Sequence, residues 1–462
     1  MLVKAEKFAQ GGRAVGHLED GRVVFIDGLF PGEEAEISIV EDKSSYCIAK
    51  VLSLVSRSPD RRVSPCSFSY QCGGCPWIGL SYPAQVDAKV SLMKELFSDL
   101  FEQFPSAMFE EPATGPEFGY RGRARFQYRI SNGKARLGFC AEKSNENIVI
   151  DSCPVADKAL NELIKTPPRL NAWELKNSEL SCISTDDGVL YDDRTGWITV
   201  GDRRLPVSNK VFFQSNLILL PSLIDYVSSM VKGPSVMDLY SGVGTFSAYL
   251  EDKYDVTAVE INKACLSLAS MHLKRTSFFT SPVEKWNPKV RSVNTVIVDP
   301  PRVGLDKKVP EMIASWKPER IIYVSCFAPT LHRDVQRLAE LGYRMESLRI
   351  FDFYPNTPHV ETVVQLSKGN ISSQNVRVEF SLEDMDMSGF QQGATYEQIQ
   401  EWIQEKYGFH VTHLNIAKTK RKCGIIERQN YNLAKSENSR SPDTPKEKEE
   451  AIIDAFLHFK MM

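Results

Sequence analysis

Short apolar runs rich in β-favouring residues, each closed by a turn signal, make up the first 57 residues. Such runs cover 23–26, 35–39 and 46–51, and turns are indicated at Gly11-Gly12, Asp20-Gly21, Asp27-Gly28 and Pro31-Gly32. This spacing of strands and turns is typical of a small β-barrel. Small barrels often bind oligonucleotides through their loops, but a barrel that only packs against other domains would show the same pattern.

Three later apolar runs are predicted strands that end in polar motifs. They are 235–239 before Tyr240-Ser241-Gly242-Val243-Gly244, 293–298 before Asp299-Pro300-Pro301-Arg302, and 321–324 before Ser325-Cys326. A helix follows the third run, with Thr330 as its expected N-cap. Residues 211–216 read as a further strand that enters an amphipathic helix at 217–231. Open α/β sheets bind ligands outside the carboxyl ends of their strands, so we expect the three motifs to meet along one edge.

The last 94 or so residues are more polar, roughly one small domain in size. Alternation over 376–382 predicts a strand, and Thr395 with Gln398 forms a capping box for a helix that Gly408 ends. A last helix is expected to run to about residue 459. The basic run between these helices is either an RNA contact or a solvated charge cluster, and consists of Lys418, Lys420, Arg421 and Lys422.

These patterns predict a multidomain protein of the α/β plus all-β class. Four domains are expected: an OB/TRAM-like barrel at 1–57, a central β-rich domain at 58–204, a Rossmann-like domain at 205–368, and a small α+β extension at 369–462. The length of 462 residues agrees with this number of domains.

Composition narrows the class without naming a function. The 42% of hydrophobic and 25% of charged residues describe an ordinary soluble protein. No apolar run is long enough to span a bilayer and the first residues lack a signal sequence, so we expect a cytoplasmic protein without a membrane partner, and a monomer. The net charge of −3 gives no global sign of nucleic-acid binding, and any RNA contact must come from a local basic patch.

One such patch is predicted in the central domain. Alternation over 120–129 places Arg121, Arg123, Arg125, Gln127 and Arg129 on one strand face and apolar side chains on the other. Guanidinium groups pair well with phosphate, so the arginine face is expected to contact RNA. A merely solvated strand face is the alternative.

The cysteines suggest a metal site, because ten cysteines without a secretory signal more often serve metal binding or catalysis than disulfides. Cys66, Cys72 and Cys75 lie close together around two glycines, and Cys153 is followed by proline. Zinc and an iron–sulfur cluster both accept four thiolates, and a redox pair is a further possibility. Since proline follows the last cysteine in iron–sulfur ligation, we favour a [4Fe–4S] cluster of structural role, with zinc as the second choice.

The turn after residue 239 indicates a nucleoside cofactor. Gly242 and Gly244 let a ligand approach the backbone, but the third glycine of a dinucleotide fingerprint is missing. An acidic residue before the turn, Asp238, and Glu260 at the end of the next strand are suited to ribose hydroxyls. With no pyrophosphate to cradle, S-adenosylmethionine is a better cofactor than NAD.

The cysteine at a strand end indicates attack on a pyrimidine ring. Alone, Cys326 would more readily be a small buried hydrophobe. Carbon 5 of uracil is a poor nucleophile, however, and thiolate addition at carbon 6 makes an enolate that can accept a methyl group. A base must then remove the proton on carbon 5. Glu361, in the segment Phe353-Tyr354-Pro355-Asn356-Thr357-Pro358-His359-Val360-Glu361, stands at a matching place, and His359 either supports it or is structural.

Over residues 1 to about 368 the sequence resembles the RNA 5-methyluridine methyltransferase family, in its branch with a TRAM domain and four cluster cysteines. The resemblance includes Gly-Arg-Ala-Val-Gly near the start, which looks like a TRAM domain. It implies Cys326 as nucleophile, Glu361 as base, and contacts to S-adenosylmethionine from Gln214, Tyr240, Glu260 and Asp299. It also implies cluster ligation by Cys66, Cys72, Cys75 and Cys153.

The sequence departs from that family in four places and leaves alternatives open. Phe327, Asn356, Thr245 and Ser281-Pro282 stand where other residues are usual, which bears on substrate detail and cofactor affinity. The expected function is methylation of carbon 5 of a uridine in ribosomal RNA (23S rRNA), with the target base flipped into the site. Transfer RNA is the second substrate. Cytosine-5 methylation is disfavoured because arginine, not cysteine, follows Asp-Pro-Pro, and a non-catalytic RNA-binding module is the alternative from another class.

Overall fold

The computed structural model describes residues 1–69, 71–131, 133–141, 144, 146–170, 178–286, 292–369, 396–423 and 445–459. Contacts between Cα atoms divide the chain into two compact units, Met1–Asp386 and Met387–Met462. Within the first unit the contacts do not separate the domains expected from the sequence, and strand β14 (Arg203–Val207) runs across the boundary expected at 204. Over the described residues, no helix combines the length and apolar character needed to cross a membrane.

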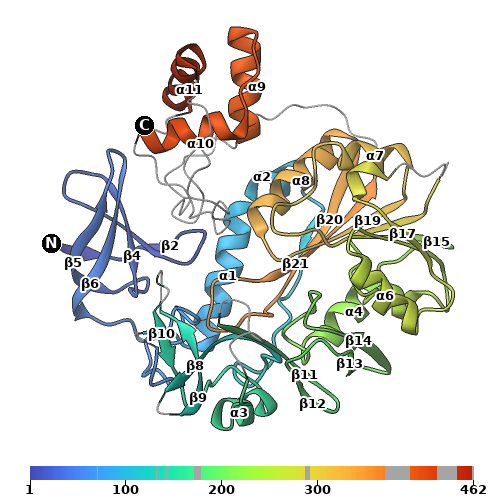
Figure 1. Cartoon of the computed structure of the whole chain (residues 1–462), viewed down its shortest axis with the longest axis horizontal. Coiled ribbons are helices and arrows are strands. Elements are labelled where there is room, and N and C mark those ends of the chain that lie inside the picture. Colours follow the sequence, from blue (N-terminus) through green and yellow to red (C-terminus); the bar gives the residue numbers. More distant parts are fainter. Residues whose placement is uncertain are drawn as a thin grey trace, which may run out of the picture. The chain divides into compact units, whose positions relative to one another are not determined.

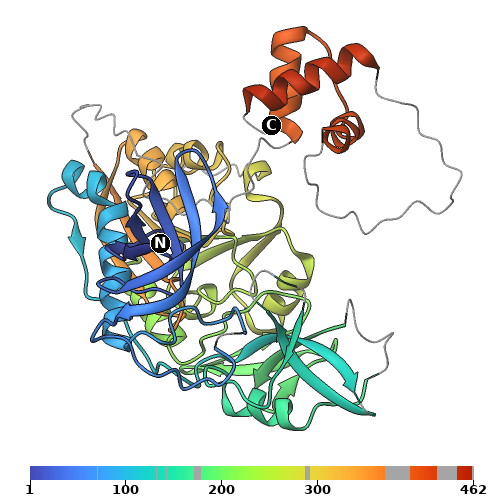
Figure 2. The ribbon, with the colours of Figure 1, turned by 90° about the vertical axis from the view of Figure 1, so that its left-hand side faces the viewer.

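The first 56 residues form the predicted small all-β domain. Its strands are β1 Leu2–Lys4, β2 Lys7–Phe8, β3 Ala14–His17, β4 Val23–Asp27, β5 Glu34–Asp42 and β6 Tyr46–Ser56. They make a curled six-stranded sheet in the order β1-β5-β6-β4-β3-β2, drawn in blue in Figure 2. Alternate apolar side chains such as Val24, Ile26 and Ile37 fill its interior, as the period of two required.

A five-stranded antiparallel sheet follows, in the order β10-β9-β8-β11-β12. Its strands are β8 Arg123–Ser131, β9 Lys134–Cys140, β10 Asn147–Val149, β11 Glu179–Thr185 and β12 Gly188–Leu190, and helix α3 (Lys158–Lys165) packs on it. The predicted alternation along β8 is confirmed, because Ala124, Phe126 and Tyr128 are buried while Arg125 and Arg129 are exposed.

The largest sheet has eight strands in the order β17-β16-β15-β18-β19-β21-β20-β7. They are β7 Met108–Phe109, β15 Ser235–Leu239, β16 Asp255–Glu260, β17 Ser277–Thr280, β18 Thr295–Val298, β19 Arg320–Ser325, β20 Tyr343–Phe351 and β21 Glu361–Lys368. The five strands from β17 to β19 run parallel, and β21 is antiparallel to both of its neighbours. The order of successive strands reverses beside β15, which is where such sheets bind ligands.

Two layers cover this sheet, as a Rossmann-like domain requires (Figure 1). One core joins it to α1 (Tyr82–Leu96), α2 (Ser98–Gln103), α7 (Val309–Ser315) and α8 (Ala328–Glu340). The other joins it to α4 (Leu220–Ser229), α5 (Ser247–Leu250), α6 (Lys263–His272) and the hairpin of β13 (Gly196–Val200) with β14. Helices α1 and α8 lie side by side, although 231 residues of the chain lie between them.

Two local predictions were wrong. Residues 211–216 form no strand, because Val211 and Phe213 pack into the core from an irregular segment, and the helix after them is shorter than expected. Helix α8 begins with Phe327 as its N-cap residue, not Thr330. Thr330 instead lies in the first turn, where its hydroxyl donates to the carbonyl oxygens of Arg302 and Phe327 at 3.0 and 3.1 Å.

The second unit is described by three helices, α9 (Tyr396–Tyr407), α10 (His413–Lys422) and α11 (Lys446–His458). These helices, drawn in orange and red in Figure 2, share a small core that includes Ile399, Ile403, Ile416, Ile452 and Phe456. The strand predicted at 376–382 and the cap at Thr395 lie outside the described residues.

Candidate active site

Cys326 and Glu361 reach one edge of the large sheet from neighbouring antiparallel strands. Cys326 follows the carboxyl end of β19, Glu361 opens β21, and Ser325 pairs with Thr362 between them. Strand β18, on the other side of β19, delivers Asp299 to the same edge. The strand-end motifs therefore meet as the sequence predicted.

A cavity of about 840 Å³ lies over this edge. The predicted site residues on its wall are Gln214, Tyr240, Gly242, Glu260, Asp299, Cys326 and Glu361. The volume is within the range of small-molecule sites, which run to roughly 1,000 Å³. One space thus holds both predicted catalytic residues and all but one of the predicted cofactor residues.

The glycine turn after β15 shapes one side of the cavity. Tyr240 and Gly242 both have a positive φ, of 60° and 55°. The Gly242 N–H donates to Glu260 Oε2 at 3.0 Å, and the Asn262 N–H donates to Oε1 at 2.7 Å. Two backbone donors therefore fix the Glu260 carboxylate at the cavity wall.

Gly244 and Asp238 serve packing rather than the cavity wall. Gly244 has a φ of 78°, which other residues adopt only with strain, and a Cβ there would lie 2.5 Å from Leu273 Cδ1, so glycine lets the turn pack closely against that leucine. Asp238 is buried and accepts hydrogen bonds from the Ser247 N–H and hydroxyl at 3.2 and 2.6 Å. The expectation that Asp238 faces a ribose is therefore not met, since neither residue lines the cavity.

Three polar atoms of the cavity residues are buried without a hydrogen-bond partner among the described residues. They are Gln214 Oε1, Ser241 Oγ and Glu361 Oε2. Buried polar groups in native proteins are nearly always hydrogen-bonded. Their convergence on one cavity therefore fits a polar ligand such as a nucleoside cofactor.

Burial and negative neighbours control the ionisation of the site. Burial, reinforced by Asp238, raises the pKa of Asp299 to about 7. Burial and then Asp299 raise the pKa of Glu361 well above its ordinary value. Burial raises the pKa of the Cys326 thiol to about 12, to which Glu361 and Asp299 add, while Arg302 acts in the opposite direction. The free site is therefore a protonated thiol beside carboxyl groups that resist ionisation together.

The segment between β20 and β21 is fixed to helix α1 by buried polar contacts. Lys89 Nζ lies 2.6 Å from Asp352 Oδ1 and 3.1 Å from the Tyr354 carbonyl oxygen. Asn356, fully buried with a φ of 68°, accepts from Gln85 Nε2 at 3.2 Å and donates its N–H to Gln85 Oε1 at 2.7 Å. Because its φ lies in the left-handed region, the backbone at Asn356 makes a strained turn before Glu361.

The four predicted cluster cysteines gather beside the central sheet. Burial, with the neighbouring Cys153 and Cys72 adding to it, raises the pKa of Cys75 to about 12. Burial also raises the pKa of Cys66 and of Cys72, with Cys153 adding in both cases. In the described part of the chain, however, no three His, Cys, Asp or Glu side chains converge closely enough to hold a metal ion. The thiols are neighbours, and all ten cysteines are free of disulfides.

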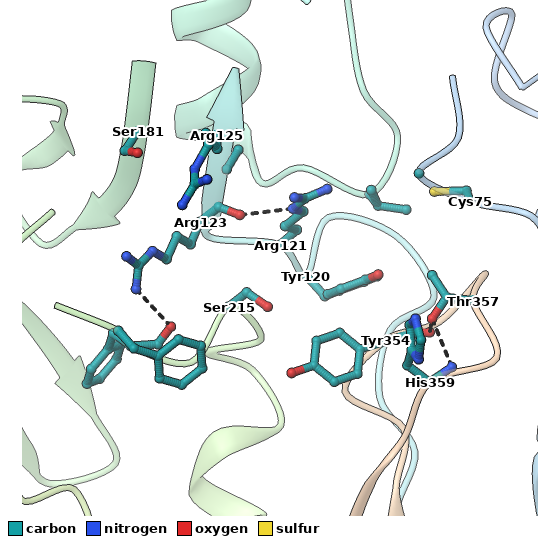
Figure 3. A pocket seen from close by; sticks show the side chains of 15 residues that line it. Cys75, Tyr120, Arg121, Arg123, Arg125, Ser181, Ser215, Tyr354, Thr357 and His359 are labelled. Atoms are coloured by element: carbon teal, nitrogen blue, oxygen red, sulfur yellow. Dashed lines mark hydrogen bonds between the residues drawn. The ribbon is translucent and has the colours of Figure 1, made fainter. Parts of the chain in front are cut away.

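A second cavity, of about 400 Å³, is lined by part of the predicted arginine face, without Gln127 and Arg129 (Figure 3). Arg121, Arg123 and Arg125 line it together with the exposed ring of Phe212. Arg121 Nε donates to the Arg123 carbonyl oxygen at 2.9 Å, and the Arg123 guanidinium lies over the Phe212 ring, 5.8 Å from its centre. An aromatic ring among guanidinium groups is a surface suited to a nucleic-acid strand.

The two cavities share part of their walls. Of the shared residues, the sequence had singled out only His359 as a candidate. The shared residues are Phe212, Phe213, Tyr354 and His359. Burial lowers the pKa of His359 to about 4, with Arg302 and Lys89 adding, so its imidazole is neutral near pH 7. The aromatic residues between the arginine cavity and the Cys326 cavity could have been suspected only from their unusual density in 212–213 and 353–354.

Family comparisons agree with this geometry. Residues 1–52 match the TRAM domain, and residues 287–369 match the family described as tRNA (Uracil-5-)-methyltransferase. An uncharacterized RNA methyltransferase of Treponema denticola is 31% identical over 401 residues, which cover 78% of this chain and 98% of the relative.

Two relatives have names that specify a substrate. The 23S rRNA (uracil(747)-C(5))-methyltransferase of Pyrococcus abyssi is 29% identical over 75% of this chain and 95% of its own length. The 23S rRNA (uracil(1939)-C(5))-methyltransferase RlmD of Methylococcus capsulatus is 29% identical over 78% and 95%. Among solved structures, the tRNA (uracil-54, C5)-methyltransferase of Pyrococcus abyssi with S-adenosyl-L-homocysteine has a TM-score of 0.63 at 24% identity, covering 79% of this chain and 99% of that one. This likeness shows a common fold.

Proposed function

Because the chain belongs to the RNA uracil-C5 methyltransferase family and is an S-adenosylmethionine-dependent enzyme with a TRAM domain, we propose that it methylates a uridine of 23S ribosomal RNA. The names of two relatives, which specify uracils of 23S rRNA, support this substrate. Transfer RNA is the second candidate, since the matching family is described by a tRNA reaction. The expected cellular site is the cytoplasm.

The reaction runs through a covalent adduct on Cys326. Its thiolate bonds to carbon 6 of the uracil, and the electron pair moves to the oxygen on carbon 4. S-adenosylmethionine supplies the methyl group that carbon 5 then accepts. Glu361 takes the proton from carbon 5, the pair re-forms the enolate, and the bond between sulfur and carbon 6 breaks to release the thiolate. The observation that carries this proposal is the shared cavity of Cys326, Glu361 and the glycine turn.

The cofactor and the RNA occupy different parts of the surface in this proposal. Gln214, Tyr240, Gly242, Glu260 and Asp299 hold S-adenosylmethionine, whose nucleoside fits the carboxylate of Glu260 and the unpartnered polar atoms. The arginine face of β8 binds the RNA backbone, and the TRAM domain adds contacts. The target base is flipped from the RNA into the Cys326 cavity.

A [4Fe–4S] cluster on Cys66, Cys72, Cys75 and Cys153 is part of the proposal, supported by the closeness of the first three thiols to Cys153 and by the proline that follows Cys153. Protein purified without oxygen should show the visible absorption that is typical of such clusters. It should also contain iron and sulfide in equal amounts. The Cys153→Ser variant should lose both, with Cys423→Ser as the matched control. If the native protein contained zinc and no sulfide, the site would hold zinc and not a cluster.

The testing experiment is methylation with labelled S-adenosylmethionine. The purified protein is incubated with total RNA that lacks 5-methyluridine, and nucleosides are analysed from separated ribosomal and transfer RNA. Label in 5-methyluridine of ribosomal RNA supports the proposal, and label in transfer RNA keeps the chemistry but moves the substrate. If Cys326→Ala were as active as Cys423→Ala, the covalent mechanism would be wrong.

A further inference from the structure

Tyr354 stands where the two cavities meet. Its side chain lines both the cavity of Cys326 and Glu361 and the cavity of the arginine face. In Figure 3 its ring lies beside Tyr120 and His359, and its hydroxyl end is directed away from the imidazole. A base that passed from the RNA surface to Cys326 would therefore contact this ring.

The backbone of Tyr354 is held rigidly. Its carbonyl oxygen accepts hydrogen bonds from Lys89 Nζ at 3.1 Å, from the Thr357 N–H at 3.2 Å and from the Thr357 hydroxyl at 2.8 Å. The next carbonyl oxygen, of Pro355, accepts from the buried Tyr120 hydroxyl at 3.0 Å. A side chain on such a support is preorganised, so it can direct a hydrogen bond with little reorganisation.

The Tyr354 hydroxyl is a neutral donor. Burial, followed by Glu361 and Cys326, raises the pKa of Tyr354 well above its ordinary value, so the phenol keeps its proton near neutral pH. Within the described residues its hydroxyl makes no hydrogen bond, unlike the hydroxyls of Tyr120, Tyr323 and Tyr343. A donor is therefore available at the cavity wall.

We propose that Tyr354 is a further catalytic residue, whose hydroxyl donates a hydrogen bond to the oxygen on carbon 4 of the target uracil. The inference rests on the proposed function. When the Cys326 thiolate bonds to carbon 6, the electron pair of the double bond moves toward that oxygen, and a fixed donor stabilises the enolate. The proton stays on the Tyr354 oxygen throughout, so no further acid or base is needed. The same enolate forms again when Glu361 removes the proton from carbon 5.

The test is the Tyr354→Phe variant, which removes only the hydroxyl. Loss of one preorganised donor to an oxyanion slows catalysis by roughly 100-fold to 1,000-fold. We expect kcat to fall by about 100-fold while KM for RNA changes by less than about threefold, because the ring is kept. Tyr343→Phe is the matched control, since its hydroxyl donates to the Pro318 carbonyl oxygen at 3.3 Å, away from both cavities, and it should be as active as the native protein.

Two further measurements separate catalysis from support. RNA containing 5-fluorouridine cannot lose a proton from carbon 5, so the covalent adduct accumulates and its rate reports on the steps up to methyl transfer. Tyr354→Phe should slow adduct formation by about the same factor as turnover. Fluorotyrosine at position 354 is a more acidic donor, so the adduct should form faster as the phenol pKa falls, whereas a structural role would be insensitive to acidity.

Unchanged kcat in Tyr354→Phe, or a rate that does not respond to fluorotyrosine, would overturn the assignment of Tyr354. Either result differs from failure of the proposed function, in which the native protein itself would form neither 5-methyluridine nor an adduct with 5-fluorouridine RNA.

Discussion

Replacing Lys89 by methionine tests how strongly helix α1 secures the segment that leads to Glu361. The ammonium of Lys89 and the carboxylate of Asp352 are 2.6 Å apart, and each side chain is only 1% exposed. Methionine keeps the length of the side chain but removes the charge. Asp352 Oδ2 already lacks a hydrogen-bond partner among the described residues, so the variant leaves a buried carboxylate with no counter-ion.

The magnitude follows from this burial. Breaking a buried pair by removing one partner costs about 3–5 kcal/mol, whereas an exposed pair contributes about 0–1 kcal/mol. The same helix provides the exposed comparison, because Lys7 Nζ and Glu95 Oε1 are also 2.6 Å apart but their side chains are 43% and 50% exposed. We therefore expect Lys89→Met to lower the free energy of unfolding by about 3–5 kcal/mol and Glu95→Gln by less than about 1 kcal/mol.

Urea unfolding followed by tryptophan fluorescence measures both variants. The double variant Lys89→Met/Asp352→Leu removes the stranded carboxylate as well, so it should recover at least half of the lost stability. If Lys89→Met cost no more than Glu95→Gln, or if the double variant were less stable than the single one, the pair would not be the buried anchor described here. Since Lys89 also binds the Tyr354 carbonyl oxygen, the folded fraction of Lys89→Met should in addition methylate more slowly.

Three further outcomes follow from the site. Glu361→Gln should form a covalent adduct with uridine-containing RNA and release it slowly, visible as a shifted band on a denaturing gel, whereas Cys326→Ala should form none. Asp299 has its folded pKa raised to about 7, so the native state binds more protons than the unfolded state between about pH 4 and 7 and loses stability as pH rises through that window. Asp299→Asn should remove this loss, so it should raise the melting temperature more at pH 8 than at pH 4. If Asp299 were ionised with an ordinary pKa, the effect of the substitution would not differ between the two pH values. Arg125→Ala should make the slope of log Kd against log salt shallower by about 1, since Arg125 is exposed on β8 and is expected to contact a phosphate.

The sequence predicted the strand ends well because each is a local pattern. An apolar run followed by glycine or Asp-Pro-Pro indicates both a strand and the point at which it ends. Since the ends of parallel strands meet at one edge of the sheet, Asp299 and Cys326 could be assigned to one site. Glu361 could be predicted as the base only because the reaction needs one and because of the family resemblance. The run 211–216 misled because Val211 and Phe213 enter the core without a partner strand, which periodicity cannot reveal.

What could not be predicted depends on contacts between distant parts of the chain. Asn356 is bonded to Gln85 across 271 residues, and Lys89 to Asp352 across 263. No local period records such pairs, so the support of Tyr354 and the meeting of two cavities at its ring were invisible in the sequence. Gly244 has a second requirement that the sequence did not show, because this glycine also approaches Leu273 closely.

The ionisation of the cavity bears on which methyl donor it suits. Burial, with Glu361 and Asp299, raises the pKa of Cys326 to about 12, so the free protein holds a thiol that is a poor nucleophile near neutral pH. Arg302 lowers the pKa of that thiol, but not enough to offset burial and the two carboxyl groups. Positive charge brought into the cavity lowers the pKa of all three groups, whereas a neutral ligand that excludes water raises them. A donor whose sulfonium is positive, as in S-adenosylmethionine, therefore suits this wall better than a neutral nucleoside, and the same carboxyl groups that suppress the lone thiol favour the charged cofactor.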